Sequence, residues 1–99
     1  MGEHTIDYTF DSANKEFLAK NETGDVVGNI GYSEENGRWT ITHTEVQPDY
    51  RGGDIARTLV RRVVEAARAS GVKLSATCPY AVKVLARTAE YQDVYAPTD

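Results

Sequence analysis

Apolar and polar residues alternate along the first half of the chain, which is typical of strands that bury one face. In the first such segment, Ile6, Tyr8 and Phe10 alternate with polar residues. The predicted strands cover residues 5–10, 16–20, 26–33 and 38–46. Turn-forming residues separate them, and the last turn contains an Asn36-Gly37 pair that tolerates the positive φ of a tight hairpin. We therefore expect an antiparallel meander in this half.

The segment 38–46 has a two-residue period, which assigns its side chains to faces. One face is expected to carry Trp39, Ile41, His43 and Glu45. The other face is expected to carry Thr40, Thr42, Thr44 and Val46. This assignment places His43 two residues before Glu45 on one side of the strand.

The period changes in the second half, where apolar residues recur at spacings of three and four. The stripe predicts a helix that buries Ile55, Ala56, Leu59, Val60, Val63, Val64, Ala66 and Ala67. Gly71 is placed to end this helix as a left-handed cap, and residues 72–77 are predicted as a fifth strand. Pro79 suits the first turn of a second helix, because that position needs no N–H group. The tail 91–99 is expected to be irregular.

A meander followed by helix, strand and helix predicts an α+β fold, with one mostly antiparallel sheet of about five strands and two helices. A chain of 99 residues fits one domain, so we expect residues 1–99 to form a single domain.

Composition and charge exclude several classes of protein. The net charge of −4 argues against a general nucleic-acid binder, which needs a basic face. No apolar stretch approaches the roughly 20 residues that span a bilayer, and residues 1–4 do not resemble a secretory signal. We therefore expect a cytoplasmic protein that contacts no membrane. Cys78 is the only cysteine, so neither a disulfide nor a cysteine-based metal site is expected.

One local exception to the acidic balance is a run of cationic residues: Arg57, Arg61, Arg62, Arg68 and Lys73. Such a run is commonly a solvated helix face. It could also attract an anionic cofactor.

The connection between the fourth strand and the first helix is the most informative stretch. A glycine-containing loop that opens into a helix presents unpaired N–H groups and the positive end of the helix dipole. Glycines let the backbone approach a phosphate, and Arg51 adds direct charge. Residues 51–56 are therefore predicted to bind an anion. The alternative is an ordinary connection that needs glycines for its turn; P-loop and dinucleotide fingerprints are both absent.

The segment EVQPDYRGGDIARTL, residues 45–59, resembles the signature of the GNAT N-acyltransferase superfamily. Cys78-Pro79-Tyr80 and Glu90-Tyr91 extend the likeness to a short subfamily of about this length. The resemblance implies that acyl-CoA lies in a wedge between the fourth and fifth strands. The matching positions are Val46, Arg51, Gly52, Gly53, Ile55 and Ala56, with Asp54 where the family usually has a glycine.

Asp54 leaves three alternatives open. A carboxylate facing the pyrophosphate would repel it by roughly 1 kcal/mol in water at about 4 Å, and by more in a partly desolvated site. A carboxylate that caps the helix would occupy the N–H groups that a phosphate needs. A carboxylate that turns to solvent would do neither.

The resemblance implies direct acyl transfer to an amine, with the backbone N–H near Val46 polarising the thioester carbonyl. His43 is the candidate base, because histidine changes protonation near neutral pH, and Glu45 could relay through water. The alternatives are a hydrogen-bonded strand histidine and a solvated carboxylate. Cys78 directly precedes a helix, and a helix N-terminus favours a nucleophilic thiol. The alternative is a buried cysteine that packs as a small apolar residue. Tyr80 resembles the tyrosine that protonates the departing CoA thiolate, and could equally be packing.

We therefore expect an acyl-CoA-dependent N-acyltransferase, with acetyl-CoA as the donor and an unidentified amine, on a small molecule or a protein lysine, as the acceptor. The alternatives are a non-catalytic module that binds CoA or phosphate and an interaction domain with the GNAT shape. The exposed edge of such a sheet would also allow a homodimer.

Overall fold

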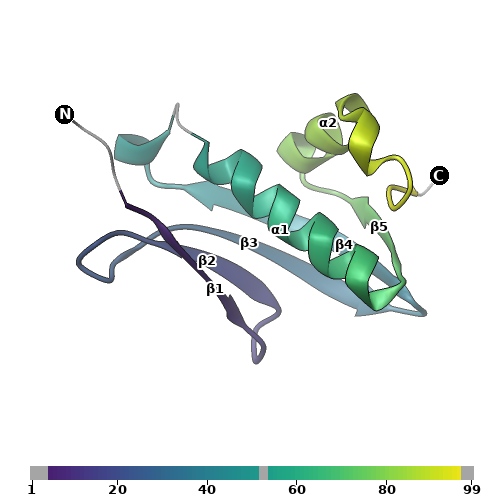
Figure 1. The fold of residues 1–99 in the computed structure, drawn as a ribbon, viewed down its shortest axis with the longest axis horizontal. Helices are drawn as coiled ribbons and strands as arrows, with labels where there is room; N and C mark the ends of the chain where they lie inside the picture. Colours follow the sequence, from purple (N-terminus) through teal and green to yellow (C-terminus); the bar gives the residue numbers. More distant parts are fainter. Residues whose placement is uncertain (1–4, 52–53, 97–99) are drawn as a thin grey trace.

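The computed structural model describes residues 5–51 and 54–96, which form one sheet and two helices (Figure 1). The strands are β1 (Asp7–Asp11), β2 (Glu16–Lys20), β3 (Val26–Glu35), β4 (Arg38–Val46) and β5 (Lys73–Ala76). The helices are α1 (Ile55–Ser70) and α2 (Pro79–Arg87), with 3₁₀ turns at Pro48–Tyr50 and Ala89–Tyr91. The strands lie in chain order, antiparallel from β1 to β4, with β5 parallel to β4. The predicted fold is confirmed.

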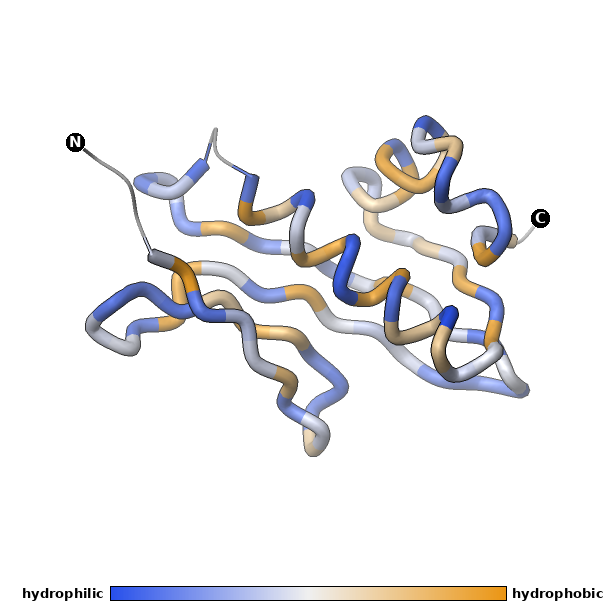
Figure 2. The backbone as a smooth tube through the Cα atoms, viewed as in Figure 1, coloured by the Kyte–Doolittle hydropathy of each residue, from blue (hydrophilic) through white to orange (hydrophobic). Residues whose placement is uncertain are grey.

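The helix α1 connects the parallel strands β4 and β5 and packs across the sheet from β2 to β5 (Figure 1). Its apolar stripe is buried at Ile55, Leu59, Val60, Val63, Val64 and Ala67. Burial of each larger side chain contributes about 1.5–3 kcal/mol, so this stripe is the main attachment of α1 to the sheet. Figure 2 shows hydrophobic and hydrophilic residues alternating around the helix. Gly71, at φ 71°, ends α1 in the predicted left-handed conformation.

The tail beyond α2 is more ordered than the sequence suggested. Leu74 N–H donates to the carbonyl of Val94 at 2.8 Å, and Ala96 N–H donates to the carbonyl of Leu74 at 2.8 Å. The backbone around Tyr95 thus pairs with the outer edge of β5. No helix or strand follows Tyr91 in the described part of the chain, but the edge of β5 offers the tail hydrogen-bond partners that no local pattern reveals.

A register shift divides β4 into two parts. Gly31 pairs with His43 and Tyr32 pairs with Ile41, so Thr42 is an extra residue on β4. Such a bulge interrupts the alternation of side chains between the two faces of a strand. The predicted common face of Trp39, Ile41, His43 and Glu45 therefore needs testing against the packing.

The packing of Gly28 identifies the two faces. A Cβ added at Gly28 would lie 3.1 Å from Ile55 Cγ2, so Gly28 and its partner Val46 face α1. His43 and Glu45 pair with the odd-numbered neighbours in β3 and face away from α1. Trp39 and Ile41, by contrast, are buried in the core beneath α1. The prediction of one shared face is wrong, because Thr42 shifts the alternation by one residue.

Candidate functional site

The strands β4 and β5 separate before β4 ends. They pair only from Arg38 with Lys73 to Ile41 with Ala76. The carbonyl of Ile41 then accepts the N–H groups of both Thr77, at 2.9 Å, and Cys78, at 3.4 Å. Beyond this point the chain leaves the sheet to begin α2, while β4 continues to Val46. The two segments diverge as a wedge that opens toward the start of α1 (Figure 1).

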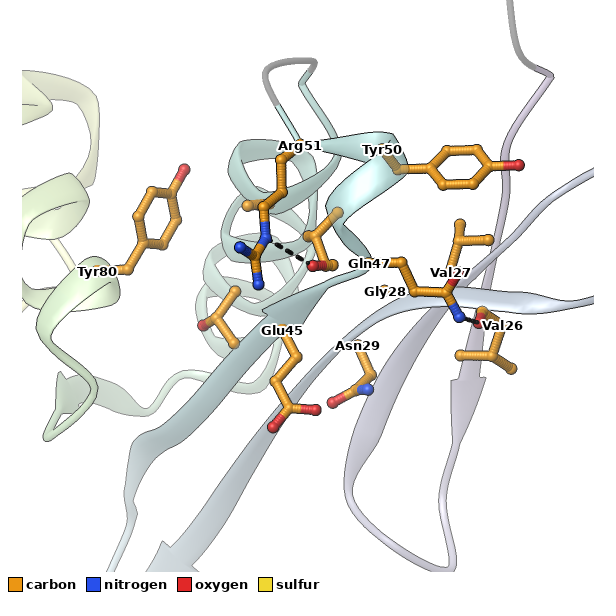
Figure 3. Close-up of a pocket in the computed structure, with 12 residues that line it drawn as sticks. Val26, Val27, Gly28, Asn29, Glu45, Gln47, Tyr50, Arg51 and Tyr80 are labelled. Atoms are coloured by element: carbon orange, nitrogen blue, oxygen red, sulfur yellow. Dashed lines mark hydrogen bonds between the residues drawn. The ribbon is translucent and has the colours of Figure 1, made fainter.

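A pocket of about 650 Å³ lies where the wedge opens (Figure 3). Its walls come from the starts of β3 and α1, the end of β4 and the following turn, and the first turn of α2. Such a volume is typical of sites for small molecules and cofactors. The sequence-predicted residues in this pocket are Val46, Arg51, Ala56 and Tyr80, and Glu45 lines it as well.

The turn after β4 is held by hydrogen bonds from the backbone and the side chain of Gln47. Its backbone N–H donates to the carbonyl of Val27 at 2.8 Å, and its Nε2 donates to the carbonyl of Val26 at 3.2 Å. Arg51 Nε donates to the carbonyl of Val46 at 3.0 Å, which places the guanidinium over the end of β4 (Figure 3). Arg51 is exposed, so it brings positive charge to the wall of the pocket. Sequence reasoning missed Gln47, whose role depends on contacts with β3.

Asp54 occupies the N-cap position of α1, yet its side chain makes no capping hydrogen bond. The carboxylate is 83% exposed, and its Oδ1 lies 3.8 Å from Nη1 of Arg57. Of the three alternatives, the structure has the carboxylate turned to solvent. The side chain therefore leaves the N–H groups of the first helical turn to other acceptors. The predicted residues Gly52 and Gly53 lie outside the described residues.

Ile55 and Ala56 differ in what they contribute at the start of α1. Ile55 is buried against Gly28 and fixes the helix to β3. Ala56 lines the pocket with a small side chain. Ile55 thus anchors the N-terminus of α1, and Ala56 leaves it accessible from the pocket.

Tyr80 stands on the first turn of α2 and lines the pocket opposite Arg51 (Figure 3). Burial raises the pKa of its phenol above the ordinary value of 10.0; the charge of Arg57 lowers it and that of Asp54 raises it, each by less. The phenol is protonated at neutral pH already at its ordinary pKa of 10.0, and the raised pKa keeps the proton on the hydroxyl further into the alkaline range. The side chain is 38% exposed, so a ligand can reach it.

Cys78 is the N-cap residue of α2 and is buried. Its Sγ donates to Oγ1 of Thr44 at 3.6 Å. Thr44 pairs with Ile30 on the face that carries α1 and also lines the pocket. The thiol therefore lies beside a wall of the pocket, behind Thr44. Sequence reasoning missed Thr44, because a threonine within a β-strand gives no local signal of such a contact.

His43 lies on the other face of the sheet, away from Cys78. A Cβ added at Gly31 would overlap Cε1 of His43 and lie 3.0 Å from each ring nitrogen, so the imidazole rests on the glycine. Nε2 of His43 lies 3.6 Å from Oε2 of Glu16 on β2. The structure thus pairs His43 with a carboxylate that sequence reasoning did not single out. A glycine inside a strand, the usual sign of a close approach, was the available signal.

Two absences complete the description. Across residues 5–51 and 54–96, no three His, Cys, Asp or Glu side chains gather in a way that could hold a metal ion. None of the helices in the described part of the chain has the length and apolar character that a bilayer crossing requires.

Comparisons with known proteins agree with this geometry. Residues 16–94 match the family model described as GCN5-related N-acetyl-transferase. A GCN5-like protein from Staphylococcus aureus, solved by NMR, is 27% identical with a TM-score of 0.74, covering 100% of this chain and 94% of its own. A GCN5-related N-acetyltransferase from Sphaerobacter thermophilus is 28% identical, with a TM-score of 0.57, over 60% of this chain and 19% of its own.

A third structure is more distant. The PaiA N-acetyltransferase from Thermoplasma acidophilum, solved in complex with coenzyme A, is 16% identical with a TM-score of 0.54, over 58% of this chain and 35% of its own. This likeness concerns the fold. The comparison with curated proteins found no match. The family model covers most of the chain, and the chain belongs to the GCN5-related N-acetyltransferase family.

Proposed function

We propose that this protein transfers an acyl group from an acyl-CoA, with acetyl-CoA as the donor, to an amine. The observation that carries the proposal is the wedge between β4 and β5, which opens onto a pocket walled by Arg51 and the start of α1. Arg51 and the N–H groups of the first turn of α1 would hold the pyrophosphate, because an exposed guanidinium and a helix N-terminus both favour anions. The solvent-facing carboxylate of Asp54 leaves those N–H groups available.

Tyr80 is proposed as the proton donor. It lies in the pocket, and its phenol carries the proton at neutral pH, as a tyrosine does at its ordinary pKa of 10.0; burial raises that pKa further. Acyl transfer releases a thiolate, and the Tyr80 hydroxyl would protonate it. A positioned acid of this kind typically contributes about 10²–10⁴-fold to a rate.

Glu45 and His43 are proposed to remove the proton from the attacking ammonium. Glu45 lines the pocket. His43, two residues earlier in β4, lies on the same face beside Glu16. A proton taken at Glu45 would pass through water to the imidazole. This route uses the face of the sheet that points away from α1, whereas Tyr80 reaches the pocket from α2.

Cys78 offers a covalent alternative. In this route the Cys78 sulfur attacks the thioester carbonyl, so that a new carbon–sulfur bond forms and the carbon–sulfur bond to CoA breaks. The departing thiolate takes a proton from Tyr80, and the proton of the Cys78 thiol replaces it. The amine then displaces the acyl group from Cys78, and its proton returns to the sulfur. The position of the thiol beside Thr44 at the pocket wall favours this step, and its burial opposes it.

The acceptor is proposed to be the amine of a small molecule or of a protein lysine, with the protein working in the cytoplasm. A homodimer through the exposed edge of β1 is proposed as well. The relative from Thermoplasma acidophilum that was solved with coenzyme A supports the choice of cofactor.

The first test combines thermal melting with intact mass, with and without acetyl-CoA. A ligand at about 100 times its Kd stabilises by about 2.7 kcal/mol, which raises Tm by several degrees in a domain of this size. Arg51→Ala should lose most of this shift, whereas Arg62→Ala, on the same molecule but outside the pocket, should keep it. An added acetyl mass on Cys78 would favour the covalent route.

A second candidate function is a CoA-binding module without catalysis, which the burial of Cys78 and the position of His43 on the face turned away from α1 favour. Acetyl-CoA would then raise Tm while a panel of amines gives no thiol release. Absence of any shift at millimolar acetyl-CoA would contradict both functions and leave the interaction domain.

A further inference from the structure

The pocket at the end of β4 is longer than the proposed chemistry requires. Tyr80 stands at one end of it and Val26 at the other, with Glu45 between them (Figure 3). The proposed transfer uses Tyr80, Arg51 and Glu45. The part of the pocket formed by Val26, Val27 and Tyr50, here called the apolar end, has no role in it.

The apolar end is open to a ligand. The large hydrophobic side chains that are exposed in residues 5–51 and 54–96 are Phe10, Val26 and Tyr80. Two of them, Val26 and Tyr80, line this one pocket, and Val26 is 40% exposed. Ligand sites are mostly lined by apolar side chains of this kind, so a bound molecule would cover surface that the fold leaves in water.

The oxygen atoms at the apolar end are already engaged. The carbonyls of Val26 and Val27 accept hydrogen bonds from Gln47 at 3.2 and 2.8 Å. The hydroxyl of Tyr50 accepts one from Nδ2 of Asn21 at 3.3 Å. This end therefore offers a ligand the methyl groups of Val26 and the ring of Tyr50.

The middle of the pocket suits one ammonium group. Glu45 is the only carboxylate among the described residues that line the pocket, and no ion pair within residues 5–51 and 54–96 includes it. Asn29 pairs with Glu45 across β3 and β4, so both side chains project from the same face. An ammonium group has three donors, which a carboxylate and a neighbouring amide oxygen can accept.

The spacing between the ammonium position and the apolar end is that of a short carbon chain. Asn29 and Val26 are three residues apart in β3, at most roughly 10 Å along the strand. A hexyl chain whose ammonium is bound at Glu45 would reach Val26. The charges nearest Val26 are Lys20, its partner on β2, and the adjacent Asp25. They have opposite signs and neither lines the pocket, so a second ammonium gains no net attraction there.

We propose that the acceptor is a small monoamine with an apolar body, bound with its ammonium at Glu45 and Asn29 and its body over Val26 and Tyr50. This inference rests on the proposed acyl transfer and narrows its acceptor. A diamine or polyamine fits less well, because its second ammonium would lose water beside apolar groups. A protein lysine fits less well, because its peptide groups would reach the apolar end without partners.

The test compares hexylamine with cadaverine, which has an ammonium in place of the terminal methyl group. NMR titration of the coenzyme A-bound protein gives the Kd of each amine, and thiol release from acetyl-CoA gives each kcat/KM. We expect hexylamine to bind at least about tenfold more tightly, since the second charge is costly to bury. Val26→Asp should cancel or reverse this preference, because a carboxylate would then attract the second ammonium. Phe10→Asp makes the same change at an exposed residue outside the pocket and should keep the preference within about twofold. Val26→Ser, which should weaken hexylamine alone, repeats the test if Val26→Asp fails to fold.

Several results would overturn the proposal. Equal affinities of the parent for hexylamine and cadaverine would contradict it, as would an equal loss of preference in Val26→Asp and Phe10→Asp. Tighter binding of hexanoyl-CoA than of acetyl-CoA, lost in Val26→Asp with the amine preference unchanged, would assign the apolar end to the acyl group of the donor. Binding is measured apart from thiol release, so the two proposals fail separately. Preferential binding of hexylamine without thiol release would contradict acyl transfer and support the amine site, whereas thiol release with cadaverine but not with hexylamine would do the reverse.

Discussion

The two faces of the sheet differ in chemistry although the same strands build both. Beneath α1 lie apolar side chains such as Ile30 and Ile41, packed into one core with the helix stripe. The face turned away from α1 carries His43, Glu45 and Glu16, all polar and accessible. The extra residue Thr42 shifts the alternation of side chains in β4. Odd-numbered residues of β4 therefore face α1 before Thr42 and face away from α1 after it.

The two faces of the sheet are expected to have separate roles, one in stability and one in catalysis. The covered face supplies the free energy that holds α1 and the wedge in place. The other face supplies groups that can move a proton. The pocket lies where they meet, with Thr44 and Val46 from the covered side. Glu45 and Asn29 come from the other side (Figure 3). If the two faces have these separate roles, substitutions on each should change different measured quantities.

The largest expected effect is on the covered face. Leu59 is fully buried in the stripe of α1, so Leu59→Ala should lower the free energy of unfolding by about 2–5 kcal/mol. Leu18, on the opposite face of β2, is only partly buried. Leu18→Ala should cost about 1 kcal/mol. Urea unfolding of the two variants measures the difference, and equal losses would contradict the division between the faces.

The next effect concerns catalysis, provided that the protein transfers acyl groups. Tyr80→Phe should lower kcat by about 10²-fold, because it removes the proposed acid. The pKa of Tyr80 is raised above its usual value of 10.0 by burial. The parent should therefore lose activity only at strongly alkaline pH, and the variant should lack that alkaline limb. An alkaline limb that persists in Tyr80→Phe would contradict its role as acid.

A smaller effect tests the contact between His43 and Gly31. A Cβ at residue 31 overlaps the imidazole, so Gly31→Ala must displace His43. We expect a loss of about 0.5–1 kcal/mol in the free energy of unfolding, since the imidazole is partly exposed and can move to another rotamer. The double variant Gly31→Ala/His43→Ala should recover most of it, since the overlapping ring is gone. Additive losses in the double-mutant cycle would show that the ring does not rest on the glycine.

The sequence predicted the helices and the strands of the meander because each follows a local period, and the family resemblance placed β5 beside β4. The stripe of α1 and its glycine cap are confirmed. The position of His43 could not be predicted, since strict alternation assumes an uninterrupted strand and Thr42 breaks it. Pairing of residue 95 with β5 depends on two segments far apart in the chain. The contacts of Cys78 with Thr44 and of His43 with Glu16 arise for the same reason.

Asp54 gives the smallest effect and the sharpest test of the pocket. Its carboxylate is 83% exposed and turned toward Arg57, so it repels a bound pyrophosphate only through solvent. Asp54→Gly should therefore tighten coenzyme A binding by only about twofold to fivefold, corresponding to under ~1 kcal/mol. The same change removes a negative charge from the start of α1 and should lower stability by about 0.3–1 kcal/mol. Calorimetry of binding and unfolding on one variant separates the two effects. Tightening by more than tenfold would mean that the carboxylate turns inward when the cofactor binds, and weaker binding would mean that Asp54 helps to hold it.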